Sequence, residues 1–276
     1  MTVCKIFTQK RLTFDQPGSK EALARQLFDA IQNIGFFYIA NFGLSQEEFD
    51  RQFAIGKSVF ELPTQKKLEC RADLEHERFA RHIHSEVVQK LLALFALLLE
   101  LPENYFAKHH RYGEALSDCH LRYMKYHARD AAINAKVDNV RVKRHTDFGS
   151  LTLLFRQPAA ALQVRGERWV RPHDGSIAVN IADALEFLSN RFLKSSIHRV
   201  VGPPPDQAGV DRLGALYFVR PEDDLELRPV QSRVLENLGY GSGANSEVAG
   251  ITAGGEARSE TSEQEIVKGV EVRYYD

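Results

Sequence analysis

The stretch RHTDFGSLTLLF, residues 144–155, sets a histidine and an aspartate two positions apart at the start of an apolar run. Side chains alternate along a β-strand, so His145 and Asp147 can point to one side while Thr146 points to the other. A turn would account for Asp-Phe-Gly but not for the histidine. Taken alone, the pair is more typical of a turn beside a hydrogen-bonded histidine, so its meaning depends on what the rest of the chain supplies.

A second histidine, His198, lies in the β-branched run KSSIHRVV further along the chain. Two histidines and one carboxylate on one face of an octahedron, with three positions open, are typical of non-haem Fe(II) oxygenases. Zinc more often binds three histidines, or histidine together with cysteine. With His198 included, a metal site has about as much support as a structural role for His145 and Asp147.

The segment DRLGALYFVRP decides between these two interpretations. Arg212 begins a strand whose alternate residues are apolar. An arginine held on a barrel wall near a metal suits a bidentate contact with a small carboxylate. The competing interpretation is a surface arginine at the end of a strand. The order His, Asp, His, Arg favours an enzyme that binds a metal and a small acid.

The residue pattern of the chain changes after Cys119, where short apolar runs alternate with Gly, Pro and Asp. This pattern predicts several short strands in a β-sandwich or β-barrel. The part before Cys119 predicts helices, which would pack outside the β region. The expected fold class is α+β, mainly β. We expect the helices over 19–35, from Ser45 (with Glu48 at capping-box spacing) to Pro63, over 74–100 and over 101–110.

The composition narrows the class of partner. The chain has 276 residues, 43% apolar and 26% charged, and a formal net charge of −1. Without an excess of Lys and Arg to bind phosphate, we expect neither a nucleic acid nor a membrane surface as a partner. Three scattered cysteines favour reduced thiols in a cytoplasmic protein, and the apolar run at 91–101 is too short to span a bilayer. A small-molecule substrate is expected, and the oligomeric state stays open.

Several segments together carry a resemblance to a known family. HTDFGSLTLLF, VNIADALEFLSN, KSSIHRVV and the arginine before YFVRP occur in that order, preceded by GFFYIANFGLS and LPENYF. This set resembles the isopenicillin N synthase-like family of Fe(II)/2-oxoglutarate-dependent dioxygenases, in particular its fungal and plant branch. The resemblance covers most of residues 20–235.

The resemblance implies a double-stranded β-helix, or jelly roll, with the N-terminal helices packed outside. It implies a single dioxygenase domain over 1–276. Within this domain, residues 1–118 would be mainly helical, 119–235 would form the jelly-roll core with the metal site, and 236–276 would be a C-terminal tail.

The resemblance also assigns site residues and cofactors. It implies that Fe(II) is bound by His145, Asp147 and His198, which would be the catalytic centre. The co-substrates would be 2-oxoglutarate and O2. Arg212 would bind the distal carboxylate of 2-oxoglutarate, and Tyr126 and Arg122 lie at matched positions close to that co-substrate.

Some positions depart from the family pattern. Gly214 stands where the family usually has Ser or Thr, which touches the same carboxylate, and Met124 stands where Asn is frequent. Arg144 precedes the first ligand, where small residues are common. The family usually has some tens of residues after the position of Asp73, so either a lid is missing or a loop has been left out of the chain. The C-terminus is also shorter than usual.

The expected reaction is hydroxylation, desaturation or ring formation at an unactivated C–H bond of a small organic metabolite, in the setting of fungal secondary metabolism. Two alternatives stay open. Gly214 allows an Fe(II) oxidase of the same fold that does not use 2-oxoglutarate, although Arg212 argues against it. Arg144 and the missing lid allow a jelly roll that binds a metal or ligand without turnover.

Other polar residues are expected to be structural. His82 and His84 are two apart on an expected helix, where they would not share a face, so both should be solvated. His110 falls near the end of an expected helix, where an imidazole suits the helix dipole. Asp183 is expected to serve a turn or the packing.

Overall fold

The computed structural model describes residues 18–69, 74–155, 159–164, 168–170 and 175–241. The junction around Asp73, where the sequence lacks the family's extra segment, lies outside the described residues. So does the part of the expected tail from residue 242 onwards. Among the residues that are described, no helix combines the length and the apolar character needed to cross a lipid bilayer.

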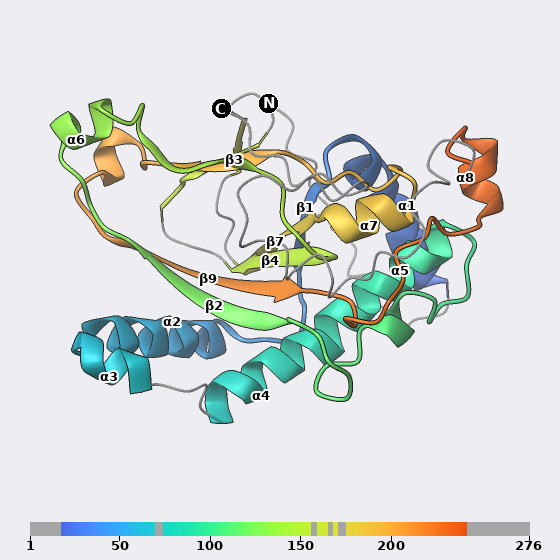
Figure 1. Cartoon of the computed structure of the whole chain (residues 1–276), viewed down its shortest axis with the longest axis horizontal. Helices are drawn as coiled ribbons and strands as arrows, with labels where there is room; N and C mark the ends of the chain where they lie inside the picture. The colour runs from blue at the N-terminus through green and yellow to red at the C-terminus, as the bar shows by residue number, and fades with distance from the viewer. Residues whose placement is uncertain (1–17, 70–73, 156–158, 165–167, 171–174, 242–276) are drawn as a thin grey trace.

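Two antiparallel sheets form the centre of the molecule, with helices around them (Figure 1). In the larger sheet the strand order is β1 (Phe36–Ala40), β7 (Ser176–Ile181), β4 (Leu151–Phe155), β9 (Arg212–Val219) and β2 (His120–Tyr126). In the smaller sheet it is β3 (Val140–His145), β8 (His198–Val201), β5 (Leu162–Val164) and β6 (Arg168–Val170). The structure combines antiparallel sheets with helices, in agreement with the coarse α+β prediction.

The helices gather mainly in the first part of the chain. Those before the β-rich part are α1 (Ser19–Asn33), α2 (Gln46–Glu61), α3 (Thr64–Glu69), α4 (Leu74–Ile83), the π-helix η1 (His84–Val88), α5 (Gln89–Leu98) and the 3-10 helix η2 (Ala107–His109). Later come α6 (Ala131–Ala135), α7 (Asp183–Leu188), the 3-10 helix η3 (Pro205–Gln207) and α8 (Arg233–Asn237). Figure 1 shows α2 and α4 along one side of the larger sheet.

Alternation along the strands of the larger sheet separates the main core from the site. The buried side chains of Leu151, Leu153 and Tyr217 face the helices and join the main hydrophobic cluster with α1, α4 and α5. Their neighbours in sequence point the other way. Leu154 belongs to a second, smaller cluster that includes Leu162 of the smaller sheet. The other face of the larger sheet, which points away from these helices and is called the inner face below, is therefore available for the polar residues of the site.

Two expected helices are confirmed in detail. Ser45 caps α2: its hydroxyl accepts a hydrogen bond from the Glu48 amide, and the Glu48 carboxylate accepts one from the Ser45 amide. The helix expected over 74–100 is present as α4, η1 and α5 in succession. The helix expected over 101–110 is wrong, because that segment consists of turns followed by the short 3-10 helix η2.

The π-helical turn η1 explains why the prediction for His84 is wrong. A π-helix adds a residue to the turn, and His84 is buried against the sheet rather than solvated. The Tyr217 hydroxyl donates to His84 Nδ1 at 3.0 Å, and His84 Nε2 donates to the His110 carbonyl at 2.7 Å. His110 is also buried: its Nδ1 donates to the Phe106 carbonyl and its Nε2 accepts from Ser150 Oγ at 2.7 Å.

This buried network predicts a pH dependence of stability. Burial lowers the pKa of His110 from 6.5 to about 4. Between these values the unfolded chain takes up a proton that the folded chain does not, so stability falls as the pH drops from 6.5 towards 4. The expected loss is about 3 kcal/mol, because a tenfold change in proton affinity corresponds to about 1.4 kcal/mol. Denaturant unfolding of the His110→Gln variant should show a flatter pH dependence over this window, whereas His127→Gln, which removes an exposed imidazole, should keep the wild-type slope.

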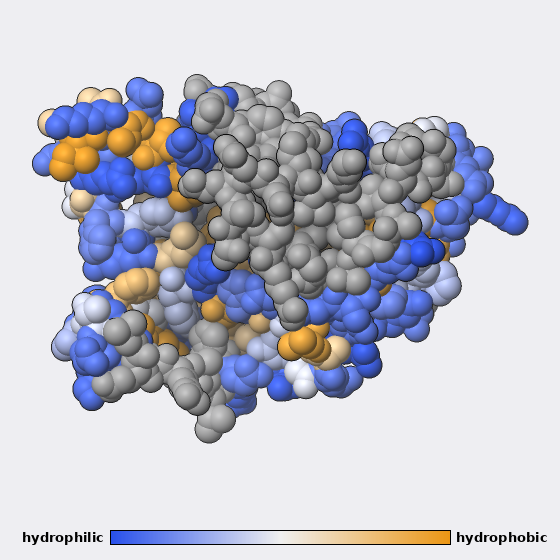
Figure 2. Space-filling view, viewed as in Figure 1, coloured by the Kyte–Doolittle hydropathy of each residue, from blue (hydrophilic) through white to orange (hydrophobic). Residues whose placement is uncertain are grey.

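One exposed apolar patch lies far from the sheets' common centre. Figure 2 shows apolar surface gathered over α6. Ile133 is 49% exposed and Val137, just after this helix, is 42% exposed. In Figure 1, α6 and α8 stand at opposite ends of the long axis of the molecule. The patch takes no part in the site described below.

Candidate metal centre

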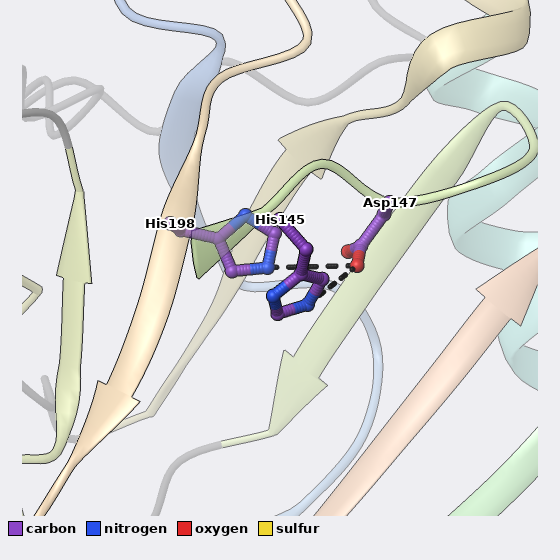
Figure 3. Close-up of side chains that lie close together, drawn as sticks. All are labelled: His145, Asp147 and His198. Carbon is purple, nitrogen blue, oxygen red and sulfur yellow. Dashed lines mark ion pairs between the residues drawn. The ribbon is translucent and has the colours of Figure 1, made fainter. Parts of the chain in front are cut away.

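Strand pairing brings the three expected ligands together. His145 ends β3 and His198 begins β8, and the two residues lie directly opposite each other in the antiparallel pair. Asp147 follows in the loop that leads from β3 to β4. Figure 3 shows the Asp147 carboxylate pointing towards both imidazoles. The side chains of Asp147 and His198 are buried, and that of His145 is 22% exposed, so the centre is open on one side only.

The distances suit a single small cation. Nε2 of His145 and Nε2 of His198 each lie 3.5 Å from Asp147 Oδ1, and one ligand atom from each of the three side chains lies within 4.8 Å of the others. An ion about 2.0–2.2 Å from each ligand atom would hold neighbouring ligands about 3 Å apart. Each imidazole–carboxylate distance of 3.5 Å therefore needs to close by about half an ångström to suit a shared ion.

Hydrogen bonds fix which nitrogen of each histidine faces the centre. Nδ1 of His145 donates to the Lys143 carbonyl at 2.9 Å, and Nδ1 of His198 donates to the Ser196 carbonyl at 3.0 Å. In a neutral imidazole only one nitrogen carries a proton, so both Nε2 atoms keep a lone pair directed at the common point. Two neutral imidazoles oriented in this way fit a metal site.

The Asp147 carboxylate is fixed in place by a hydrogen bond, and it is ionised. Asn180 Nδ2 donates to Asp147 Oδ2 at 2.9 Å, which leaves Oδ1 for the two histidines. In the metal-free protein, burial alone would raise the pKa of Asp147, but the charge of a protonated His198 and hydrogen bonds from both histidines hold it well below its usual range. Burial alone would lower the pKa of His198, and the charge of Asp147 raises it. A divalent cation would replace the proton that this pair shares.

Asp183 ties the ligand segment to α7, a role that the sequence did not indicate. Its backbone amide donates to the Asp147 carbonyl at 2.9 Å, and its carboxylate accepts from Thr146 Oγ1 at 2.9 Å. Burial raises the pKa of Asp183 to about 6 despite that hydrogen bond. The expectation of a turn or packing role did not include these contacts, by which Asp183 orients the segment between His145 and Asp147. The only sequence signal is an acid at a strand-to-helix junction.

Arg212 and Tyr126 form a second polar pair on the inner face. They lie opposite each other on β9 and β2, with the guanidinium carbon 5.2 Å from the centre of the Tyr126 ring. Arg212 is 6% exposed, and burial lowers its pKa to about 10. Within the described ranges no acid pairs with it, and its Nε has no hydrogen-bond partner. Because a buried cation requires compensation, this arrangement fits a carboxylate ligand.

The other residues that the sequence analysis singled out lie at different positions along the strands. Arg122 shares the inner face with Tyr126 but lies four residues earlier on β2, opposite Leu216. Gly214 lies opposite Met124 between the two pairs, so neither residue supplies a polar group there. Arg144 is exposed, and it lies in the stretch of β3 between Val142 and His145 where the pairing with β8 is irregular.

Two histidines and one carboxylate between antiparallel sheets, open on one side, are typical of mononuclear non-haem iron oxygenases. Residues 8–119 match the family model described as the N-terminal part of the non-haem dioxygenase in morphine synthesis. Residues 117–221 match the model of the 2OG-Fe(II) oxygenase superfamily. The chain belongs to this superfamily of Fe(II)- and 2-oxoglutarate-dependent dioxygenases, which are oxidoreductases, and its cofactors are Fe(II), 2-oxoglutarate and O2.

Curated relatives and solved structures agree with this placement. A UPF0676 protein of Schizosaccharomyces pombe is 26% identical over 267 residues, which covers 75% of this chain and 80% of that protein. The 2-oxoglutarate-dependent dioxygenase gloE of Glarea lozoyensis is 32% identical over 161 residues, but the match spans only 58% of this chain and 47% of gloE. A full-length protein of Neurospora crassa, crystallised with alpha-KG and 5-formyluracil, shares the fold with a TM-score of 0.74 at 22% identity, covering 87% of this chain and 89% of that one.

Proposed function

We propose that this protein oxidises an unactivated C–H bond of a small organic metabolite, using Fe(II), 2-oxoglutarate and O2. The observation that carries the proposal is the combination of the His145–Asp147–His198 group with a buried arginine that lacks an acidic partner among the described residues. The product would be hydroxylated, desaturated or cyclised. The fungal origin of gloE and of other named dioxygenases among the relatives supports a place in fungal secondary metabolism.

The proposal includes a finer description of the fold. The two antiparallel sheets would form the double-stranded β-helix, with the metal centre between them and the N-terminal helices outside. We also propose one dioxygenase domain, with its mainly helical part before residue 119 and its β core after it. The strand order supports this description, as do the two family models, which adjoin near residue 118.

Each polar residue has a separate task in the proposed reaction. His145, Asp147 and His198 would hold Fe(II), and Asn180 and Asp183 would keep Asp147 and its neighbours in place. When bound, Fe(II) with 2-oxoglutarate and O2 supplies the oxidant for C–H cleavage and leaves succinate and CO2. The Phe36 ring, 5.5 Å from the His198 ring and edge-on to it, would help to exclude water from the centre.

Arg212 and Tyr126 would bind the distal carboxylate of 2-oxoglutarate. Arg212 would supply two parallel N–H donors. Burial raises the pKa of Tyr126 although the charge of Arg212 lowers it, so the phenol stays protonated and can donate. With Gly214 in place of a hydroxyl residue, these two side chains would carry the contact. Gly214 is also the observation that favours the second candidate, an oxidase of the same fold that uses no 2-oxoglutarate.

Visible absorption distinguishes the two candidates. Fe(II) added under nitrogen, followed by 2-oxoglutarate, is expected to produce a weak charge-transfer band as the keto acid chelates the metal. Bound iron without such a band would favour the oxidase. A failure to bind iron in the purified protein would contradict both candidates and would favour a non-catalytic role. Substrate-stimulated release of CO2, screened over small metabolites, then identifies the reaction.

A further inference from the structure

We propose that the substrate is an organic acid and that Arg122 binds its carboxylate. The inference rests on the proposed function, because it concerns the molecule that reacts beside the metal. The resemblance to the dioxygenase family groups Arg122 with the co-substrate. The structure instead points to a separate anion site on the same inner face, closer to the metal centre along the sheet.

The strand register separates Arg122 from the co-substrate site. Tyr126 lies opposite Arg212, whereas Arg122 lies opposite Leu216. Four residues of an antiparallel strand extend about 13 Å, so the two backbone positions lie well apart, although the Arg122 charge is still close enough to lower the pKa of Tyr126. Arg122 therefore lies beside the co-substrate site and is not a member of the Tyr126–Arg212 pair.

The same register places Arg122 near the metal. Asn180, which donates to Asp147, pairs with Thr152, and Thr152 pairs with Phe218 on the next strand. Neighbouring strands are about 4.8 Å apart, so two strand spacings put the Phe218 backbone roughly 10 Å from that of Asn180. The Arg122 guanidinium stands over the Phe218 ring, 5.1 Å from its centre.

The electrostatic state of Arg122 leaves room for an anion. The side chain is exposed, and no acid in the described part of the chain pairs with it. Nearby cations do have acidic partners, since Arg220 pairs with Asp118 and Lys125 with Asp211. Stacking on an aromatic ring holds a guanidinium plane in place and leaves its N–H edge free for two parallel bonds to a carboxylate.

An apolar wall beside Arg122 fits the rest of the substrate. Leu216 and Phe218 lie on the inner face of β9 and are only partly buried. Neither belongs to the two hydrophobic clusters of the described residues. Met124, partly buried as well, follows on the same face of β2. The site therefore suits a molecule with an apolar or aromatic body and one carboxylate, held so that the body lies between Arg122 and the metal.

The test compares arylalkanoic acids with their neutral amides. Phenylacetate, 3-phenylpropionate and 4-phenylbutyrate, each beside its primary amide, are titrated calorimetrically into protein with Fe(II) and saturating 2-oxoglutarate under nitrogen. At least one acid is expected to bind about tenfold more tightly than its amide, from a charge-assisted pair in a partly exposed site. Arg122→Gln should remove this preference, and Arg122→Lys should restore part of it.

A matched control removes a stacked guanidinium elsewhere. Arg81 lies over the Tyr112 ring at 5.5 Å on α4, and Arg81→Gln should leave the acid preference unchanged. Equal binding of every acid and its amide to the wild type, or a preference that survives Arg122→Gln, would overturn the inference. So would a preference that Arg212→Gln removes and Arg122→Gln does not, because the acid would then occupy the co-substrate site.

The two proposals can fail separately. No metal ligand belongs to the Arg122–Phe218 wall, so the acid preference should persist, weakened, in protein treated with a chelator. If 2-oxoglutarate produces no absorption band but the acid preference depends on Arg122, only the proposed function fails. If the band forms in both wild type and Arg122→Gln but no acid preference exists, only the present inference fails.

Discussion

Replacing Asp147 by alanine is expected to abolish iron-dependent formation of succinate. Asp147 is the only carboxylate that faces both His145 Nε2 and His198 Nε2 among the described residues. Its removal would leave two neutral imidazoles, which cannot balance a divalent cation. Mutation of a residue that only orients a metal ligand typically lowers metal affinity by about 10–100-fold. Loss of the ligand itself should therefore cost more than about 100-fold.

Iron binding and succinate formation are measured on the same Asp147→Ala preparation, with thermal unfolding as a check that the chain is folded. Asp206→Ala serves as the control, because Asp206 is an exposed acid on η3 that does not belong to the His145–Asp147–His198 group. Wild-type iron affinity in Asp147→Ala would show that the metal binds elsewhere. Iron binding lost without loss of the folded state is the expected pattern.

Much of this arrangement was predictable because it depends on local periodicity. His145 and Asp147 do lie on one side, as predicted, although Asp147 reaches that side from the loop after β3 and not from a strand. The capping box at Ser45 correctly marked the start of α2. The pairing of His145 opposite His198 was not readable from either segment alone. It came from the resemblance, which carries the topology of the family with it.

The wrong predictions arose where tertiary contacts decide local structure. His84 was expected in water because it lies two residues from His82 on an expected helix, where the two would not share a face, but a π-turn directs it to Tyr217 and the His110 carbonyl. No sequence pattern links Asp183 to Thr146, because the two residues come into contact only when the chain folds. Short polar contacts between distant segments leave no periodic signal, so sequence reasoning finds the ligands more readily than the groups that hold them.

Replacing Arg212 by glutamine is expected to raise the 2-oxoglutarate concentration needed for half-maximal turnover by about 100-fold, because truncating one partner of a buried charged pair typically costs 2–5 kcal/mol. Arg212 is buried, the Tyr126 ring lies against its guanidinium, and its Nε has no hydrogen-bond partner among the described residues. Because the proposed contact would anchor the end of the co-substrate that does not react, KM should rise far more than kcat falls. Iron affinity should stay near the wild-type value, and Arg228→Gln, which removes an exposed arginine paired with Glu226, should change neither constant. An unchanged KM in Arg212→Gln would remove the main argument for 2-oxoglutarate and favour the oxidase.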